Sequence, residues 1–321
     1  MYRVLRTDLP LIALSLRLLG GVCTVTSIAI TPASAGAPEE VVARLKARHT
    51  DFRRLEIRWT ALHFVKRGAL SSQRSEWPQP LLDASHKLAY RAVLDEESIR
   101  LERNGPFWSV REDSFVDAHL IQAYDSTTAI LHNEVPFGEY TGTGYVFKRT
   151  REAARSLFSG DWQFDAFFLA FRPLNDVYSN LQPDLNEKPT FAEWQGENCL
   201  VFERRIGDAL RLQSWINVNQ GVVVRQRRFD GARTRQDLII KYENRRQVGL
   251  VPCQWQFSRF HDLTGAKVES YHVVDIDYDR MPEITDDLFT ASWKPGMLIS
   301  DGNASQRYSI VNEDGSLEIR H

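Results

Sequence analysis

The chain contains little cysteine and no excess of charge of either sign, and both features limit its functions. It has 3 cysteines in 321 residues, and its 40 lysines and arginines nearly balance its 42 aspartates and glutamates. The arginine cluster between residues 225 and 235 is interleaved with Asp230 and Asp237. Such a chain has no long-range positive field to attract a phosphate backbone. We therefore expect no nucleic-acid partner.

The sequence also lacks the short motifs of common enzyme classes. Its 8 histidines form no HxxxH or HExxH pair, and no serine lies in a G-x-S-x-G elbow. Gly142-Thr143-Gly144 has neither the further glycines nor the following helix of a phosphate-binding loop, and we interpret it as a short loop. We expect a protein that is not an enzyme and needs no cofactor. A catalytic pair assembled from distant strands stays open as an alternative.

Three alternate aspartates, Asp275, Asp277 and Asp279, match the first ligand positions of a calcium loop. The sixth position of that loop is Arg280, although the sharp turn there requires glycine. The residues between the aspartates are apolar, and this alternation is typical of a strand with one solvated face. We therefore predict a strand here and no metal site.

No hydrophobic run is long enough for an ordinary transmembrane helix. Arg17 interrupts the long apolar stretch near the N-terminus and leaves about 13 residues after it, whereas a span needs about 20. A positive start at Arg3 and Arg6 and the small residues Ala33-Ser34-Ala35 are typical of a cleaved export signal. We predict that residues 1–35 are a signal peptide. The alternative is an uncleaved signal that anchors the protein in the inner membrane.

The predicted mature protein begins at Gly36 and is periplasmic or otherwise exported. Removal of the leader leaves 37 basic and 41 acidic residues, so its net charge is near −4. Cys199 and Cys253 remain after cleavage. An oxidising compartment permits a disulfide between them, and two separate buried thiols are the alternative.

The apolar periodicity predicts one helix followed by a meander of strands. Helical spacing after Pro38 predicts a helix over 38–53, and from Leu55 the period changes to two. Two short helices, or one interrupted helix, are predicted over 151–171, and a short tail with a hairpin at Asp314-Gly315 closes the chain. The order indicates an α+β protein without a parallel nucleotide-binding sheet. The further predicted strands are Lys87–Leu94, Ser98–Arg103, His119–Tyr124, Ala129–Asn133, Cys199–Arg205, Ala209–Asn217, Val222–Phe229, Gln236–Asn244, Pro252–Asp262 and Lys267–Tyr278.

An aromatic cluster in the middle of the chain is the strongest apolar signal of the predicted mature protein. It is either part of a packed core or the lining of a cavity between a curved sheet and its helices. In the second case its rings would bind acyl chains through burial, at about 0.8 kcal/mol per methylene. The candidate ligand-binding residues are Phe158, Trp162, Phe164, Phe167, Phe168 and Phe171.

Several short segments resemble one known family. The first helix leads into Leu55-Glu56-Ile57-Arg58-Trp59, and the chain later contains Gln247-Val248-Gly249-Leu250-Val251-Pro252, a turn at Thr264-Gly265 and Asp286-Asp287-Leu288-Phe289-Thr290. Ala123-Tyr124-Asp125-Ser126 resembles a further turn, with serine where many relatives have glycine. In this order the segments resemble the outer-membrane lipoprotein carriers, the LolA/LolB-like superfamily.

This resemblance implies an antiparallel half-barrel of about ten or eleven strands wrapped around helices, which encloses an apolar cavity for lipoprotein acyl chains. The domain would cover residues 36–291, with inserts near 66–86 and 134–195. Residues 292–321 would form a short C-terminal extension.

Our leading hypothesis is an exported, non-enzymatic protein of the cell envelope that binds a lipid, an acyl chain or a lipidated protein in an apolar cavity. The second hypothesis is a structural or assembly module that docks another envelope protein and whose interior is filled by its own side chains. An envelope hydrolase is the third, with no residue set to name.

Overall fold

The computed structural model describes residues 38–69, 80–109, 111–148, 158, 162–174, 182–206, 210–261, 264–280, 282–285, 287–290, 292–302 and 308–320. Residues 36–321 form one compact unit. The predicted signal peptide lies outside the described residues, as do residues 151–157 of the predicted middle helices. None of the described helices is both long and apolar enough to span a membrane.

The first helix, α1 (Pro38–Asp51), begins where the sequence predicts it. Glu39 and Glu40 in its first turn favour the positive end of the helix dipole. Its buried face carries Val41, Leu45 and Arg48. A short 3-10 helix, η2 (Trp162–Phe164), and helix α3 (Asp165–Phe171) follow in the middle of the chain.

The strands form two runs of hairpins and a C-terminal addition. The first run is β1 (Arg54–Val65), β2 (Ala84–Asp95), β3 (Ser98–Ser109), β4 (Ser114–Tyr124), β5 (Thr128–Asn133) and β6 (Gly142–Lys148). The second is β7 (Thr190–Trp194), β8 (Glu197–Ile206), β9 (Leu210–Asn217), β10 (Val222–Asp230), β11 (Arg233–Arg245), β12 (Gly249–Phe260) and β13 (Lys267–Asp279). The addition is β14 (Met297–Asp301), β15 (Tyr308–Val311) and β16 (Leu317–Arg320).

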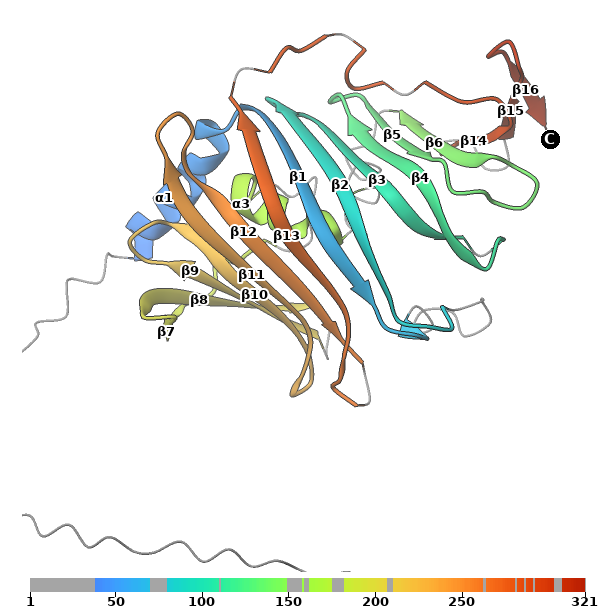
Figure 1. Ribbon diagram of the computed structural model, residues 1–321. Helices are drawn as coiled ribbons and strands as arrows, with labels where there is room; N and C mark the ends of the chain where they lie inside the picture. Colours follow the sequence, from blue (N-terminus) through green and yellow to red (C-terminus); the bar gives the residue numbers. More distant parts are fainter. Residues whose placement is uncertain are drawn as a thin grey trace, which may run out of the picture. The chain divides into compact units, whose positions relative to one another are not determined.

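All these strands belong to one open sheet, in the order β16-β15-β14-β6-β5-β4-β3-β2-β1-β13-β12-β11-β10-β9-β8-β7 (Figure 1). Neighbours are antiparallel except β14, which pairs with β6 in parallel. The two runs meet where β1 pairs with β13, from Glu56 opposite Asp279 to Val65 opposite Glu269.

The predicted half-barrel of ten or eleven antiparallel strands is therefore corrected in three respects. The sheet is mixed and has sixteen strands among the described residues, and β7 was not predicted. Gly142-Thr143-Gly144 lies in β6 rather than in a loop. The predicted extension continues the same sheet, and its hairpin of β15 and β16 is confirmed.

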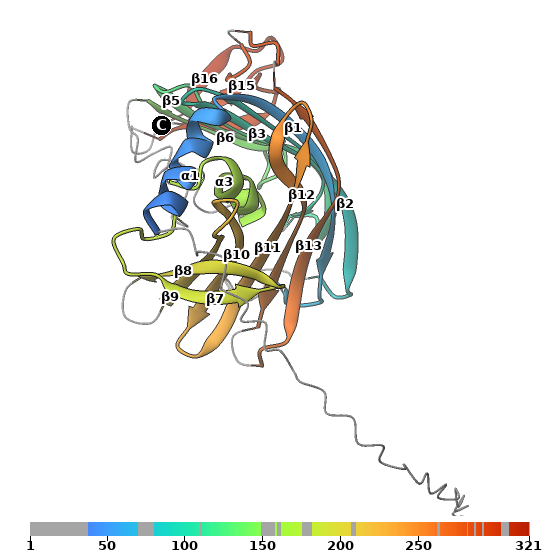
Figure 2. The same ribbon diagram turned by 90° about the vertical axis from the view of Figure 1, so that its left-hand side faces the viewer.

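The core lies on the side of the sheet that carries the helices. Figures 1 and 2 show α1 and α3 on the same side of a curved sheet. Six of the seven residues of α3 are buried, and they join one cluster with the apolar side chains of β1, β2, β3, β8, β11, β12 and β13. The predicted strand with alternate aspartates is β13, on which Asp275, Asp277 and Asp279 are exposed.

Candidate functional site

The predicted aromatic cluster lies in the centre of the core. Phe158, Phe164, Phe167, Phe168 and Phe171 are each at most 1 % exposed. The side chain of Trp162, the sixth candidate, lies outside the described part. The five described rings are thus packed against the protein itself, and their role in binding a ligand stays a prediction.

Trp59 on β1 contacts four other aromatic rings of the core. Its indole stacks on Tyr90, with centroids 5.1 Å apart and planes at 5°, and on Phe167 at 6.3 Å. Trp255 and Phe164 meet it edge-on at 5.3 and 6.1 Å. These are the preferred geometries of aromatic pairs, which join α3 and η2 to both halves of the sheet.

The polar atoms of Trp59 and Tyr90 are hydrogen-bonded. Trp59 Nε1 donates to the Tyr271 hydroxyl at 2.5 Å. The Tyr90 hydroxyl donates to Gln163 Oε1 at 2.6 Å, and Arg103 Nη1 donates to the same oxygen at 2.6 Å. A buried polar group costs free energy unless it has a partner, so these bonds fix η2 against β2 and β3.

Arg48, a residue that the sequence analysis did not select, connects α1, α3 and β12. Its Nε donates to the Ala170 carbonyl at 2.6 Å, and both Nη atoms donate to the Leu250 carbonyl at 3.2 Å. The guanidinium also lies 5.0 Å from the centroid of the Phe52 ring. Burial lowers the pKa of Arg48. The available sequence signal was its position, three residues after Leu45 on the apolar face of the predicted helix.

Arg172 has a similar role directly after α3 and is only 1 % exposed. Its Nη1 donates to the carbonyls of Phe171 at 3.0 Å and His49 at 3.3 Å. Its Nη2 donates to the carbonyl of Glu96 at 3.4 Å. The two arginines therefore supply donors to backbone oxygens at the ends of both helices, which fixes α3 in place.

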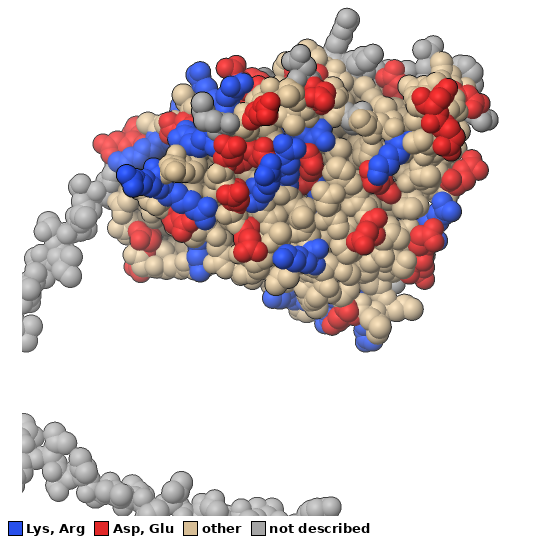
Figure 3. Space-filling view, turned by 45° about the horizontal axis from the view of Figure 1, so that its top comes forward, with Lys and Arg blue, Asp and Glu red and all other residues tan. Residues whose placement is uncertain are grey.

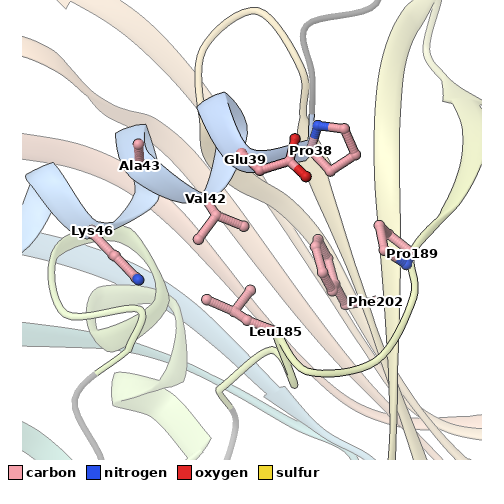
Figure 4. A pocket seen from close by; sticks show the side chains of 8 residues that line it. All are labelled: Pro38, Glu39, Val42, Ala43, Lys46, Leu185, Pro189 and Phe202. Carbon is pink, nitrogen blue, oxygen red and sulfur yellow. The ribbon is translucent and has the colours of Figure 1, made fainter.

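A cavity of about 450 Å³ lies beside this core, between α1 and the segment 182–189. Phe202 of β8, which is 2 % exposed, belongs to its wall. Figure 4 shows the side chains of Val42 and Leu185 facing each other across it. The described residues that line it are Pro38, Glu39, Val42, Ala43, Lys46, Leu185, Pro189 and Phe202. The site combines an apolar centre with charged residues at its margin.

A second cavity of about 340 Å³ adjoins the same segment. Leu185 lines both cavities. The other described residues that line the second cavity are mainly polar: Gln182, Pro183, Asp184, Asn186 and Arg204, together with Leu174. The first cavity is therefore the better candidate for an apolar ligand.

A charged network on β3 and β4 holds the segment that leads to β14. Glu102 accepts a hydrogen bond from Arg100 Nε at 2.5 Å and lies 3.5 Å from His119 Nε2. Arg100 Nη1 donates to the carbonyls of Leu288 at 2.8 Å and Thr290 at 2.7 Å. Burial opposes the ionisation of Glu102, but the side-chain contacts with His119 and Arg100 and the charges of Arg100 and Arg91 outweigh it and lower the pKa of Glu102 to about 2.

The same segment packs on β5 and β6. Trp293 stacks on His132 with centroids 5.6 Å apart. Lys294 Nζ lies 2.7 Å from Glu134 Oε2. A Cβ atom on Gly144 would lie 2.4 Å from Trp293 Cζ3, so only glycine leaves room for the indole. In Figure 3 acidic and basic side chains are interspersed over the face that it displays.

Cys199 and Cys253, the two cysteines of the predicted mature protein, are separate thiols in the structure. Cys199 lies on β8 and Cys253 on β12, and β9, β10 and β11 run between those strands. Four strand spacings of about 4.8 Å separate them along the sheet, whereas a disulfide requires Cα atoms within about 7 Å. Of the two alternatives, the structure has two unpaired thiols. Burial raises the pKa of Cys199 to about 11.

Comparison with known proteins gives structural matches only. No protein-family model and no curated protein matches the sequence. One similar solved structure is a domain from Vibrio parahaemolyticus described as an outer membrane lipoprotein-sorting protein, with 13% identity and a TM-score of 0.42. The match covers 79% of this chain and 97% of that one.

Two further structures match over similar lengths. A LolA superfamily protein from Nitrosomonas europaea has 8% identity and a TM-score of 0.43, with 79% of this chain and 97% of that one covered. An uncharacterized conserved protein from Thermus thermophilus has 7% identity and a TM-score of 0.33, with 82% and 98% covered. The solved structures to which this chain is similar include a LolA superfamily protein and a lipoprotein-sorting domain.

Proposed function

We propose that this chain is an exported, non-enzymatic protein of the cell envelope that holds an acyl chain, from a lipid or a lipidated protein, in the 450 Å³ cavity between α1 and β8. One observation carries the proposal: a cavity of a size typical of small-ligand sites has Val42, Leu185 and Phe202 in its wall. The signal-like leader supports the assignment to the envelope.

The cavity suits an acyl chain because such a ligand binds mainly through burial. Each buried methylene contributes about 0.8 kcal/mol, so ten contribute about 8 kcal/mol before the cost of ordering the ligand. Val42 is partly buried, and Phe202 closes the wall from the side of the sheet.

We place the ligand in this cavity rather than among the predicted aromatic residues. The five described phenylalanines already contact one another and the sheet, and the hydrogen bonds of Arg48 and Arg172 hold α3 against them. Opening this cluster would break buried contacts, whereas the cavity beside α1 exists without any rearrangement. The aromatic cluster then serves as the rigid support of the site.

Filling the cavity from α1 tests the proposal. Ala43 lines the cavity and is exposed, so Ala43→Trp places a large ring there with little effect on the core. Ala47 is also exposed on α1 but does not line the cavity, and Ala47→Trp is the matched control. We expect Ala43→Trp to weaken the uptake of a fluorescent acyl probe at least tenfold, and the control to bind like the wild type. Unchanged uptake by Ala43→Trp would exclude this cavity as the site.

An assembly module that docks another envelope protein is the second candidate function, because the aromatic interior is filled by side chains. Uptake of the acyl probe by the wild-type chain distinguishes the two functions. A wild-type chain that takes up no acyl probe, and that carries no lipid after purification from its native envelope, would favour the assembly module.

A further inference from the structure

Lys46 is a charged residue of the cavity that has no partner in the described part of the chain. It is exposed on α1, and no ion pair or hydrogen bond joins it to another described residue. Glu39 is the other charged residue among the described residues of the lining, and the two are seven positions apart, about 10 Å along the helix. Figure 4 shows them at opposite sides of the cavity with Val42 and Leu185 between them.

Building on the proposed function, we infer that the ligand is a single-chain amphiphile with an anionic head, such as a carboxylate, and that Lys46 binds this head. The apolar residues between the two charges define the path of the chain. The Glu39 carboxylate repels an anionic head at its own end of the cavity. The ligand is therefore oriented, with its head at Lys46 and its chain toward Phe202.

The volume of the cavity matches a chain of medium length. A volume of 450 Å³ holds about 15 groups of about 30 Å³, the volume of one water molecule. A methylene group is of similar size, so a chain of about twelve carbons fits with its head at the margin. A much longer chain would leave methylenes in water and gain little further affinity.

The experiment compares dodecanoate with dodecanol, which have the same chain and differ in the charge of the head. Each competes with a fluorescent acyl probe for the full chain at pH 8. We expect Lys46→Gln to weaken dodecanoate binding about three- to fivefold and to leave dodecanol unchanged, the size expected for an exposed charge pair. Lys46→Arg should restore the binding of dodecanoate. Lys87→Gln, at an exposed lysine of β2 outside the cavity, is the control.

The outcomes separate this inference from the proposed function. If Lys46→Gln weakens both ligands equally or neither, the assignment of the head to Lys46 is overturned while acyl binding stands. Equal affinity of the wild type for both ligands would also overturn it. If the wild type binds neither ligand, the proposed function fails together with the inference.

Discussion

Arg48 shows how one side chain determines the position of a functional surface. It lies on the buried face of α1, but its guanidinium reaches backbone oxygens of α3 and β12. Arginine suits this role because its planar group offers several donors in a fixed geometry. The helix that lines one side of the cavity is thereby attached to the core.

Removal of this group should destabilise the protein. Arg48→Met removes these donors from the buried carbonyl of Ala170 and the partly buried carbonyl of Leu250, and we expect a loss of about 2–4 kcal/mol in the free energy of unfolding. Urea denaturation measures it, with Lys46→Met at an exposed position of the same helix as the control. A loss of less than about 0.5 kcal/mol, the range of an ordinary surface substitution, would show that the hydrogen bonds of Arg48 do not stabilise the packing of α1.

Glu102 should make stability depend on pH in the acid range. Its pKa in the folded protein, about 2, is lower than its ordinary value of 4.5, so its contribution is fully present above about pH 5 and is lost as the pH falls through 4.5 toward 2. Glu102→Gln should therefore flatten the dependence of the free energy of unfolding on pH between 5 and 2. Urea denaturation at several pH values measures this, with Glu193→Gln at an exposed position as the control. Equal slopes in Glu102→Gln and the wild type would disprove the assignment.

Single residues were the least predictable part of the molecule. The sequence predicted that Val41 and Leu45 lie on the apolar face of the first helix, because burial follows the helical period. It did not indicate that Arg48 would be buried on the same face or that Lys46 would line a cavity. The contacts of Arg48 join it to segments 122 to 202 residues away in the chain, and a local pattern does not encode them.

At the scale of elements, periodicity was reliable where strands are long and half-buried. β1 alternates between buried and exposed residues over most of its length, and it was predicted from Leu55. The sequence pattern did not predict β6, because two glycines in three residues favour a loop. Gly144 instead accommodates the indole of Trp293, a residue 149 positions away in the chain.

The close contact between Gly144 and Trp293 can be tested by substitution. Gly144→Ala places a Cβ atom 2.4 Å from Trp293 and 2.5 Å from Ile299, and such overpacking should cost about 1–3 kcal/mol of stability. Thr143→Ala in the same strand is the control. In a Trp293→Ala background the cost should fall, since the clash with the indole is gone and only that with Ile299 is left. Additive effects of the two substitutions would mean that the strand requires Gly144 for a reason other than the indole.

At the scale of the whole molecule, the contacts described above all lie within one compact unit. That unit spans residues 36–321 and does not include the predicted leader. We expect a chain that begins at Gly36 to unfold within about 2 °C of the full chain, a shift that corresponds to less than about 1 kcal/mol. Thermal unfolding of the two chains measures this. A decrease of more than about 5 °C would show that the leader contributes to the fold.

The pairing of β1 with β13 has a consequence for how this chain reaches its native state. Most neighbouring strands on either side of that pair are consecutive in sequence, whereas the pair itself joins residues such as Thr60 and Asp275, 215 positions apart. Loop closure over such a distance is slow relative to hairpin formation. Two half-sheets should therefore assemble early and independently, and the seam between them should close last and limit the rate of folding.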